Sequence, residues 1–267
     1  MLCCTGTSYP AINSNDLARI SICIPSLPEQ QKIADFLTSV DGKIQALTRK
    51  VDKLKEYKKG VMQKILPPYK AKSSSSQRFS RFNDWKEYSL KELIVTRSEK
   101  SNVDLPKYSL TLEKGVTPKE ARYEREFLVS DVSDAYKVMK EGDFALNPMN
   151  LRFGAIAKHK EKFDVLVSKY YDIFYCNEKL NPVYAEAFFQ SYNMIQYYNM
   201  MSTGSLIEKR RVHYSDFLDF KFLFPSIEEQ TKIANFLSSI DQKISAAEDQ
   251  LDKMKEWKKG LLQKMFV

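Results

Sequence analysis

The chain has 267 residues, of which 43% are hydrophobic and 12% aromatic, and its formal net charge is +8 at pH 7. This apolar content can build a sizeable core and more than one folding unit, which excludes a disordered or fibrous chain. No run of about 18 apolar residues predicts a membrane span. No signal-peptide pattern opens the sequence, so we expect a cytoplasmic protein. The positive charge favours an acidic partner, with nucleic acid first.

Side chains that common catalytic and cofactor sites require are scarce. The four cysteines follow no metal-ligand spacing, and His159 and His213 are the only histidines. Neither histidine belongs to a His-Glu-x-x-His pattern, and no glycine-rich motif would cradle a phosphate. Most acid/base and zinc chemistries therefore lack their usual side chains, and we expect no metal, nucleotide or other cofactor site.

In chain order, the first predicted element is a strand-like segment, Leu17–Ile24, with alternating isoleucines. A helix over residues 27–66 follows, because apolar side chains recur with the 3.5-residue period of a coiled-coil seam. The stripe comprises Ile33, Leu37, Val40, Ile44, Leu47, Val51, Leu54, Lys58, Val61 and Ile65. Lys58 interrupts it, either to fix a register or to reach past the seam into water, and we favour the second interpretation.

Residues 67–78 predict a polar linker, because Pro67-Pro68 stops the helix and four serines follow. Residues 79–225 predict one mixed α+β domain. Strands are expected at Tyr88–Val95, Phe144–Leu146, Gly154–Ala157 and Asp172–Tyr175. A helix is expected over Pro182–Met201, with inward-facing Tyr184, Phe188, Phe189, Tyr192 and Ile195.

The last element, a helix over residues 226–267, repeats the first one at a spacing of 200 positions. Ile24–Ile44 recurs as Phe224–Ile244, and Asp52–Gly60 recurs as Asp252–Gly260, without a slip in register. The second stripe comprises Ile233, Leu237, Ile240, Ile244, Ala247, Leu251, Met254, Lys258, Leu261 and Met265. Because the domain joins the end of one helix to the start of the other, we expect an antiparallel coiled-coil stalk within the chain.

The repeated Pro-x-x-x-Glu-Gln-x-Lys-Ile-Ala-x-Phe-Leu motif resembles the specificity subunits of type I restriction-modification systems. It occurs at Pro25–Ile44 and Pro225–Ile244, each time at the start of a long helix, and Thr203-Gly204-Ser205 precedes the second copy. The resemblance implies a target recognition domain that reads half of a bipartite site in double-stranded DNA. It also implies adenine-methylating subunits and a DNA-cleaving, translocating restriction subunit as partners, and no catalysis by the chain itself.

The chain departs from the family's order, which is domain, helix, domain, helix. Residues 1–26 match only the end of a first domain, so we expect a truncated subunit with one complete recognition domain. The segment Leu17–Ile24 would then be disordered or would pack on another chain as an added strand. A homodimer, or pairing with another specificity subunit, would supply the second half-site, and the oligomeric state stays open.

Asn147, Asn150 and Arg152 are candidates for contacts to base edges. Asparagine pairs well with adenine and arginine with guanine, through two hydrogen bonds each. The family's recognition domains resemble this region, where a strand after Gly142-Asp143 leads into a polar loop. The alternative is that both asparagines cap turns beside Pro148.

Two basic clusters are candidates for contacts to the DNA backbone. Lys158 and Lys160 form one. Lys209, Arg210 and Arg211 form the other, together with the hydroxyls of Thr203 and Ser205. The alternative for both is an ordinary solvated turn.

The leading hypothesis is a sequence-specific DNA-binding subunit that reads a half-site and docks methylation subunits on its helices. The alternative is an assembly or regulatory module that reads no DNA and pairs with other specificity or methylation subunits through its coiled coil. An autonomous methyltransferase or nuclease ranks last.

Overall fold

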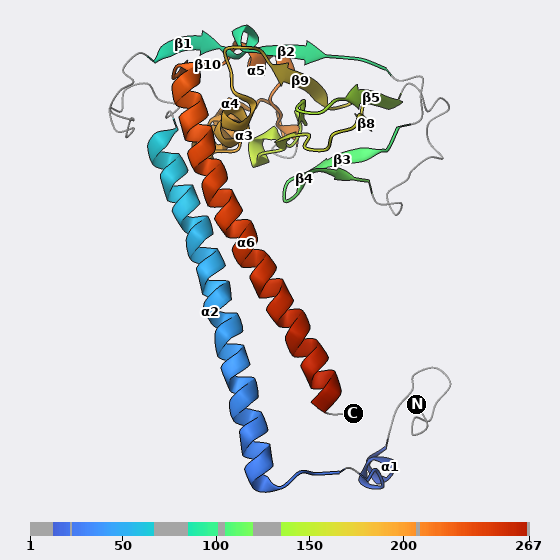
Figure 1. The fold of residues 1–267 in the computed structure, drawn as a ribbon. Helices are drawn as coiled ribbons and strands as arrows, with labels where there is room; N and C mark the ends of the chain where they lie inside the picture. Colours follow the sequence, from blue (N-terminus) through green and yellow to red (C-terminus); the bar gives the residue numbers. More distant parts are fainter. Residues whose placement is uncertain are drawn as a thin grey trace. The chain divides into compact units, whose positions relative to one another are not determined.

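In the computed structural model, the described residues are 13–21, 23–66, 85–100, 105–119, 135–206 and 209–265. The chain divides into two compact units, residues 1–50 with 247–267, and residues 51–246. The fold is mixed α+β with two long helices, as the sequence predicts (Figure 1). None of the helices in the described residues is long and apolar enough to cross a membrane.

The long helices are α2 (Leu27–Ile65) and α6 (Ile227–Met265), and each has 39 residues. Every position of the two predicted stripes is buried or half-buried, which confirms the seam. In the unit of residues 1–50 and 247–267, Phe36 packs edge-on against Trp257, with ring centroids 6.1 Å apart. In the unit of residues 51–246, the end of α2 and the start of α6 share one hydrophobic core. Within each unit the two helices lie antiparallel (Figure 1).

The lysines in the stripes are engaged by carboxylates of the opposite helix. Lys58 Nζ donates to Asp241 Oδ1 at 2.6 Å, and Lys258 makes the repeat-equivalent bond to Asp41. Both lysine side chains are only 28% exposed. The interpretation that these lysines reach past the seam into water is therefore wrong, and they contribute to the register of the pairing.

The domain contains short strands in four antiparallel groups. A four-stranded sheet has the order β2-β9-β6-β7, and the other groups are the pairs β1-β10, β3-β4 and β5-β8. The strands are β1 (Lys86–Ser89), β2 (Ile94–Arg97), β3 (Tyr108–Thr111), β4 (Gly115–Pro118), β5 (Tyr136–Met139), β6 (Phe144–Leu146), β7 (Ile156–Lys158), β8 (Val165–Ser168), β9 (Asp172–Cys176) and β10 (Lys221–Phe224). Predicted strands thus correspond to β6, β7 and β9.

Short helices connect and cover these strands. They are α1 (Ser14–Ala18), the 3-10 turns η1 (Leu90–Glu92) and η5 (Leu151–Phe153), α3 (Pro182–Phe189), α4 (Tyr192–Met201) and α5 (Tyr214–Asp219). The core between sheet and helices is aromatic. Phe144 and Phe174 stack across β6 and β9 at 5.2 Å, and Phe189 of α3 meets both rings edge-on. Each fully buried ring stabilises the fold by about 1.5–3 kcal/mol relative to an exposed one.

Three predicted elements differ from the structure. Tyr88–Val95 is divided between β1 and β2, because the Ser89 amide and hydroxyl both donate to the Glu92 carboxylate and close the turn η1. The helix Pro182–Met201 is broken, because the Ser191 hydroxyl accepts a bond from the Met194 amide and caps a new helix. Tyr192 is consequently 51% exposed rather than inward-facing.

The strand expected at Leu17–Ile24 is also wrong for the residues described there. Ser14–Ala18 forms the short helix α1, and residues 20, 21, 23 and 24 have no regular structure. The repeat-equivalent strand β10 forms because it pairs with β1. Residues 21, 23 and 24 pair with no strand among the described residues.

Candidate nucleic-acid interface

The loop of residues 147–154 leaves β6, crosses η5 and returns into β7. Asn147 Oδ1 accepts a hydrogen bond from the Met149 amide at 3.1 Å, so this side chain closes the turn, as the alternative interpretation expected. Asn150 is exposed and its side chain does not cap η5. The loop ends at Gly154, whose φ of +93° favours glycine. Of the two asparagines, Asn150 is the one whose amide faces solvent.

Arg152 lies on η5 with its guanidinium carbon 4.3 Å from the ring centroid of Phe153. Its Nε is buried without a hydrogen-bond partner among the described residues. Phe153 is 53% exposed, so the stacked pair lies at the surface of the loop. A planar guanidinium stacked on an aromatic ring is held ready for paired hydrogen bonds.

The loop of residues 202–211 follows α4 and lies beside the 147–154 loop, because the Val212 amide donates to the Pro148 carbonyl at 3.2 Å. Thr203 and Arg211 exchange two backbone hydrogen bonds, of 2.8 and 2.9 Å, which close the loop. A side chain at Gly204 would meet the Arg210 backbone at 2.9 Å, so the Thr-Gly-Ser motif needs its glycine. The structure thus brings two separately predicted segments together.

The basic residues of this second loop have different roles. Arg210 donates to the carbonyls of Ser202 and Asn199 at the end of α4, with a shortest distance of 2.8 Å, so it completes the helix terminus. Lys209 and Arg211 are exposed, as are Thr203 and Ser205. Lys209 and Arg211 are therefore available to a ligand, whereas Arg210 is largely occupied.

A buried ion pair holds the base of the 147–154 loop. Asp143, 1% exposed at the start of β6, accepts from Arg97 Nε at 2.7 Å and from the Lys140 amide at 2.8 Å. Burial raises the pKa of Asp143, while these hydrogen bonds favour its charged form. Bonds from Lys140 and Arg97 lower the pKa of Glu99 beside it. The Gly142-Asp143 motif thus orients the strand that delivers the loop.

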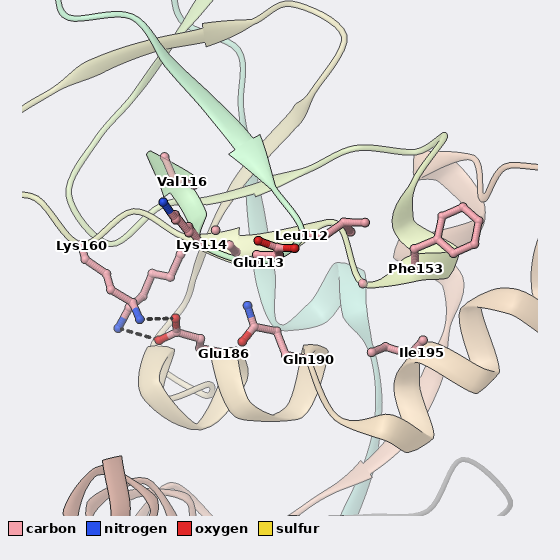
Figure 2. Close-up of a pocket in the computed structure, with 13 residues that line it drawn as sticks. Leu112, Glu113, Lys114, Val116, Phe153, Lys160, Glu186, Gln190 and Ile195 are labelled. Atoms are coloured by element: carbon pink, nitrogen blue, oxygen red, sulfur yellow. Dashed lines mark ion pairs between the residues drawn. The ribbon is translucent and has the colours of Figure 1, made fainter. Parts of the chain in front are cut away.

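Lys158 and Lys160 line a cleft of about 360 Å³ beside these loops (Figure 2). Both lysines converge on Glu186 of α3, with Nζ–carboxylate distances of 3.7 and 2.8 Å. Lys158 is 16% exposed and Lys160 is 69% exposed. His159 between them points into the core, where its Nε2 meets the Phe163 carbonyl at 2.8 Å. One carboxylate therefore offsets part of this basic cluster.

The opposite wall of the cleft is the β3–β4 hairpin, with Glu113 and Lys114 at its tip (Figure 2). Gly115 allows this close approach, because a side chain there would lie 3.1 Å from the Ala157 methyl group. Lys114, Glu186 and the hairpin were not predicted from the sequence, because no spacing pattern links them. Among the described residues, no group of three or more His, Cys, Asp or Glu side chains could hold a metal ion.

The sequence is similar to known proteins along nearly its whole length. Residues 3–56 match the family described as type I restriction modification DNA specificity domain. The type I restriction enzyme MjaVIII specificity subunit of Methanocaldococcus jannaschii is 25% identical over 281 residues, covering 96% of this chain and 64% of that protein. The putative MjaX specificity subunit of the same organism is also 25% identical, covering 94% of this chain and 60% of that protein. The chain thus spans less than two thirds of the length of either relative.

Solved structures share the fold. The HsdS subunit from Thermoanaerobacter tengcongensis has a TM-score of 0.59 and 16% identity, covering 98% of this chain and 64% of that one. The type I restriction-modification S subunit from M. genitalium has a TM-score of 0.56 and 14% identity, covering 100% and 68%. The chain is similar in sequence to type I restriction enzyme specificity subunits and shares the fold of the solved HsdS subunits.

Proposed function

We propose that the chain is a DNA-reading subunit of a type I restriction-modification complex, and that residues 79–225 form its target recognition domain. The observation that carries this proposal is the junction of two polar loops, 147–154 and 202–211, through the Val212–Pro148 backbone bond. This junction places exposed Asn150, the guanidinium of Arg152 against Phe153, and the exposed cations Lys209 and Arg211 on neighbouring segments. Such a combination supplies both contact types that sequence-specific DNA binding needs.

The side chains divide into two roles. Asn150 and Arg152 contact base edges, because both groups form paired hydrogen bonds in the major groove. Lys209 and Arg211 contact phosphates, with Thr203 and Ser205 as hydroxyl donors, and Lys158 and Lys160 extend this contact around the cleft. Asn147 and Arg210 hold the loops in shape.

Chemistry belongs to partner subunits in this proposal. The two long helices dock adenine-methylating subunits, and a DNA-cleaving, translocating subunit joins the assembly in the cytoplasm. The chain contributes recognition and spacing, and itself catalyses nothing. Residues 1–26 correspond to the C-terminal end of a first recognition domain.

Sequence-specific DNA binding is tested by selecting, from a pool of randomised duplexes, those that the purified chain binds. We expect enrichment of one short half-site. N150A and R152Q should change that motif, because each mismatched or lost base contact costs about 1–3 kcal/mol of discrimination. K209Q/R211Q should keep the motif but flatten the salt dependence by about one or two units. The matched control, K253Q/K255Q on α6, removes the same charge and should do neither.

Enrichment of no motif, with the chain folded, would contradict the reading role. It would favour the alternative of an assembly module that pairs with other specificity subunits. One observation supports that alternative, namely the exposure of Leu17, Ile20 and Ile24. Co-purification with a full-length specificity subunit, lost in L17S/I20S, is its positive test.

A further inference from the structure

A second hollow, of about 400 Å³, lies where the end of α2 meets the start of α4. We call it the lysine groove, and its lining residues are Lys55, Lys58, Lys59, Met62, Gln63, Gln190, Tyr192 and Ile195. The three lysines occupy consecutive turns of one helix face, since i, i+3 and i+4 positions are neighbours. Met62 and Ile195 contribute an apolar floor beneath these cations.

The residues that line the lysine groove include three lysines and no acidic residue. Lys58 bonds to Asp241, but Lys59 is exposed and forms no ion pair with any described residue. Lys59 Nζ instead lies 5.7 Å from the ring centroid of Tyr192, which is itself half exposed. Cations in a hollow with apolar walls focus a positive potential, which attracts an anionic ligand.

The lysine groove continues the candidate interface. Gln190 and Ile195 line both this groove and the cleft that contains Lys158 and Lys160. The cleft has three lysines against two glutamates, whereas the groove has three lysines and no acid. The cleft and the lysine groove are therefore adjacent hollows, and each has three lysines in its lining. A duplex has one phosphate about every 3.4 Å of each strand, which matches an extended line of cations better than a small anion does.

We propose that the lysine groove binds the phosphate backbone of double-stranded DNA that flanks the half-site, with Lys59 as its principal contact. The groove thus extends the footprint from the recognition domain onto the first helix. This inference rests on the proposed DNA-reading function. It adds a contact that reads no sequence but fixes the direction in which the duplex leaves the domain.

The internal repeat supplies a matched control. Lys259 is the equivalent of Lys59, in Asp252–Gly260 as against Asp52–Gly60, and the ten residues 51–60 and 251–260 have the same burial at every position. Lys259 belongs to the unit of residues 1–50 and 247–267, whereas the recognition loops belong to the other unit. K59Q and K259Q therefore remove the same charge from the same local structure.

The experiment measures anisotropy of a fluorescein-labelled 30-base-pair duplex of random sequence, titrated with the full chain from 50 to 300 mM KCl. K59Q should weaken binding about five- to tenfold at 0.1 M salt and reduce the salt slope by about one. K259Q should change affinity less than about twofold. Equal effects of the two substitutions would overturn the lysine groove as a DNA contact and would leave it to an acidic protein segment. No binding by the unmodified chain would overturn the proposed function and this inference together.

Lysine acetylation provides a readout without any substitution. With saturating duplex, acetylation of Lys59 should slow by at least about threefold, while Lys259 should react as it does without DNA. Mass spectrometry of the peptides separates the two sites. Unchanged acetylation of Lys59 in a complex that does form would overturn the inference but not the proposed function.

Discussion

Residues 14–44 and 214–244 are two copies of one sequence pattern in different surroundings. Phe217, Phe220 and Phe224 lie in the core of the domain, with at most 4% of each residue exposed. Their equivalents Leu17, Ile20 and Ile24 are 59%, 44% and 69% exposed. The copies share what depends on near neighbours along the chain, and differ in what depends on a partner surface.

The shared features are local. Gln30 Nε2 donates to the Pro25 carbonyl at 2.8 Å, and Gln230 makes the same bond to Pro225 at 3.0 Å. Only Gln230 also donates to the Lys179 carbonyl and accepts from the Asn181 amide. The motif thus builds the helix start in both copies, and the domain adds further bonds to one of them.

The largest expected contrast is between F217A and L17A. Phe217 is fully buried against other aromatic rings, so F217A should cost about 3–5 kcal/mol of unfolding free energy. L17A should stay within about 0.5 kcal/mol. Urea unfolding followed by circular dichroism measures both. A similar cost for L17A would show that the first copy is packed as the second is.

Gln230 and Gln30 give the next contrast. Q230A should cost about 1–3 kcal/mol, because the Gln230 side chain is buried and its part-buried bonds to the backbone of Lys179 and Asn181 are lost. Q30A should cost less than about 1 kcal/mol, because only the local bond to Pro25 is lost. Thermal melts of both variants provide the comparison. Equal losses of stability in Q230A and Q30A would mean that only the shared bond at the start of each helix contributes, and that the added bonds of Gln230 do not.

For Asp41 and Asp241, by contrast, we expect substitutions in the two copies to have equal effects on stability. D41N and D241N each remove one ion pair to a half-buried lysine, so each should cost about 0.2–1 kcal/mol at low salt. Both losses should shrink in 1 M salt, where charges are screened within about 3 Å. Urea midpoints at the two salt concentrations report the effect. A cost for one variant alone would show that the pairing differs between the two halves.

Much of the fold follows from the sequence because it is local or periodic. The stripes at the 3.5-residue period, the repeat and the short strand Phe144–Leu146 all agree with the structure. The breaks at Ser89 and Ser191 were missed because the hydrogen bonds of a single serine decide each of them, while the apolar pattern continues across both positions. Hydrogen-bonding side chains compete with hydrophobic periodicity over a few residues.

Less of the candidate site than of the fold could be predicted from the sequence. Asn150 and Arg152 were predicted because their chemistry suits base recognition, and their role stays a prediction. The occupation of Arg210 by α4 carbonyls, and of Lys158 by Glu186, depends on contacts that no spacing encodes. The lysine groove was missed for the same reason, since Tyr192 and Ile195 come from a helix more than 120 positions after Lys59.

The smallest expected effect concerns Cys23, in the first copy, and Cys176, in the domain. Burial raises the pKa of Cys176 to about 12, so at pH 8 only roughly one thiol in ten thousand is the reactive thiolate. Cys23 is exposed. Iodoacetamide should therefore label Cys23 more than about tenfold faster, and labelling of Cys176 should rise about tenfold per pH unit between pH 7 and 9. Labelled Cys23 should leave unfolding unchanged. Slow labelling of Cys23, read by peptide mass spectrometry, would mean that its segment is covered in the assembled protein, and the contrast between the two copies would then reflect partners rather than sequence.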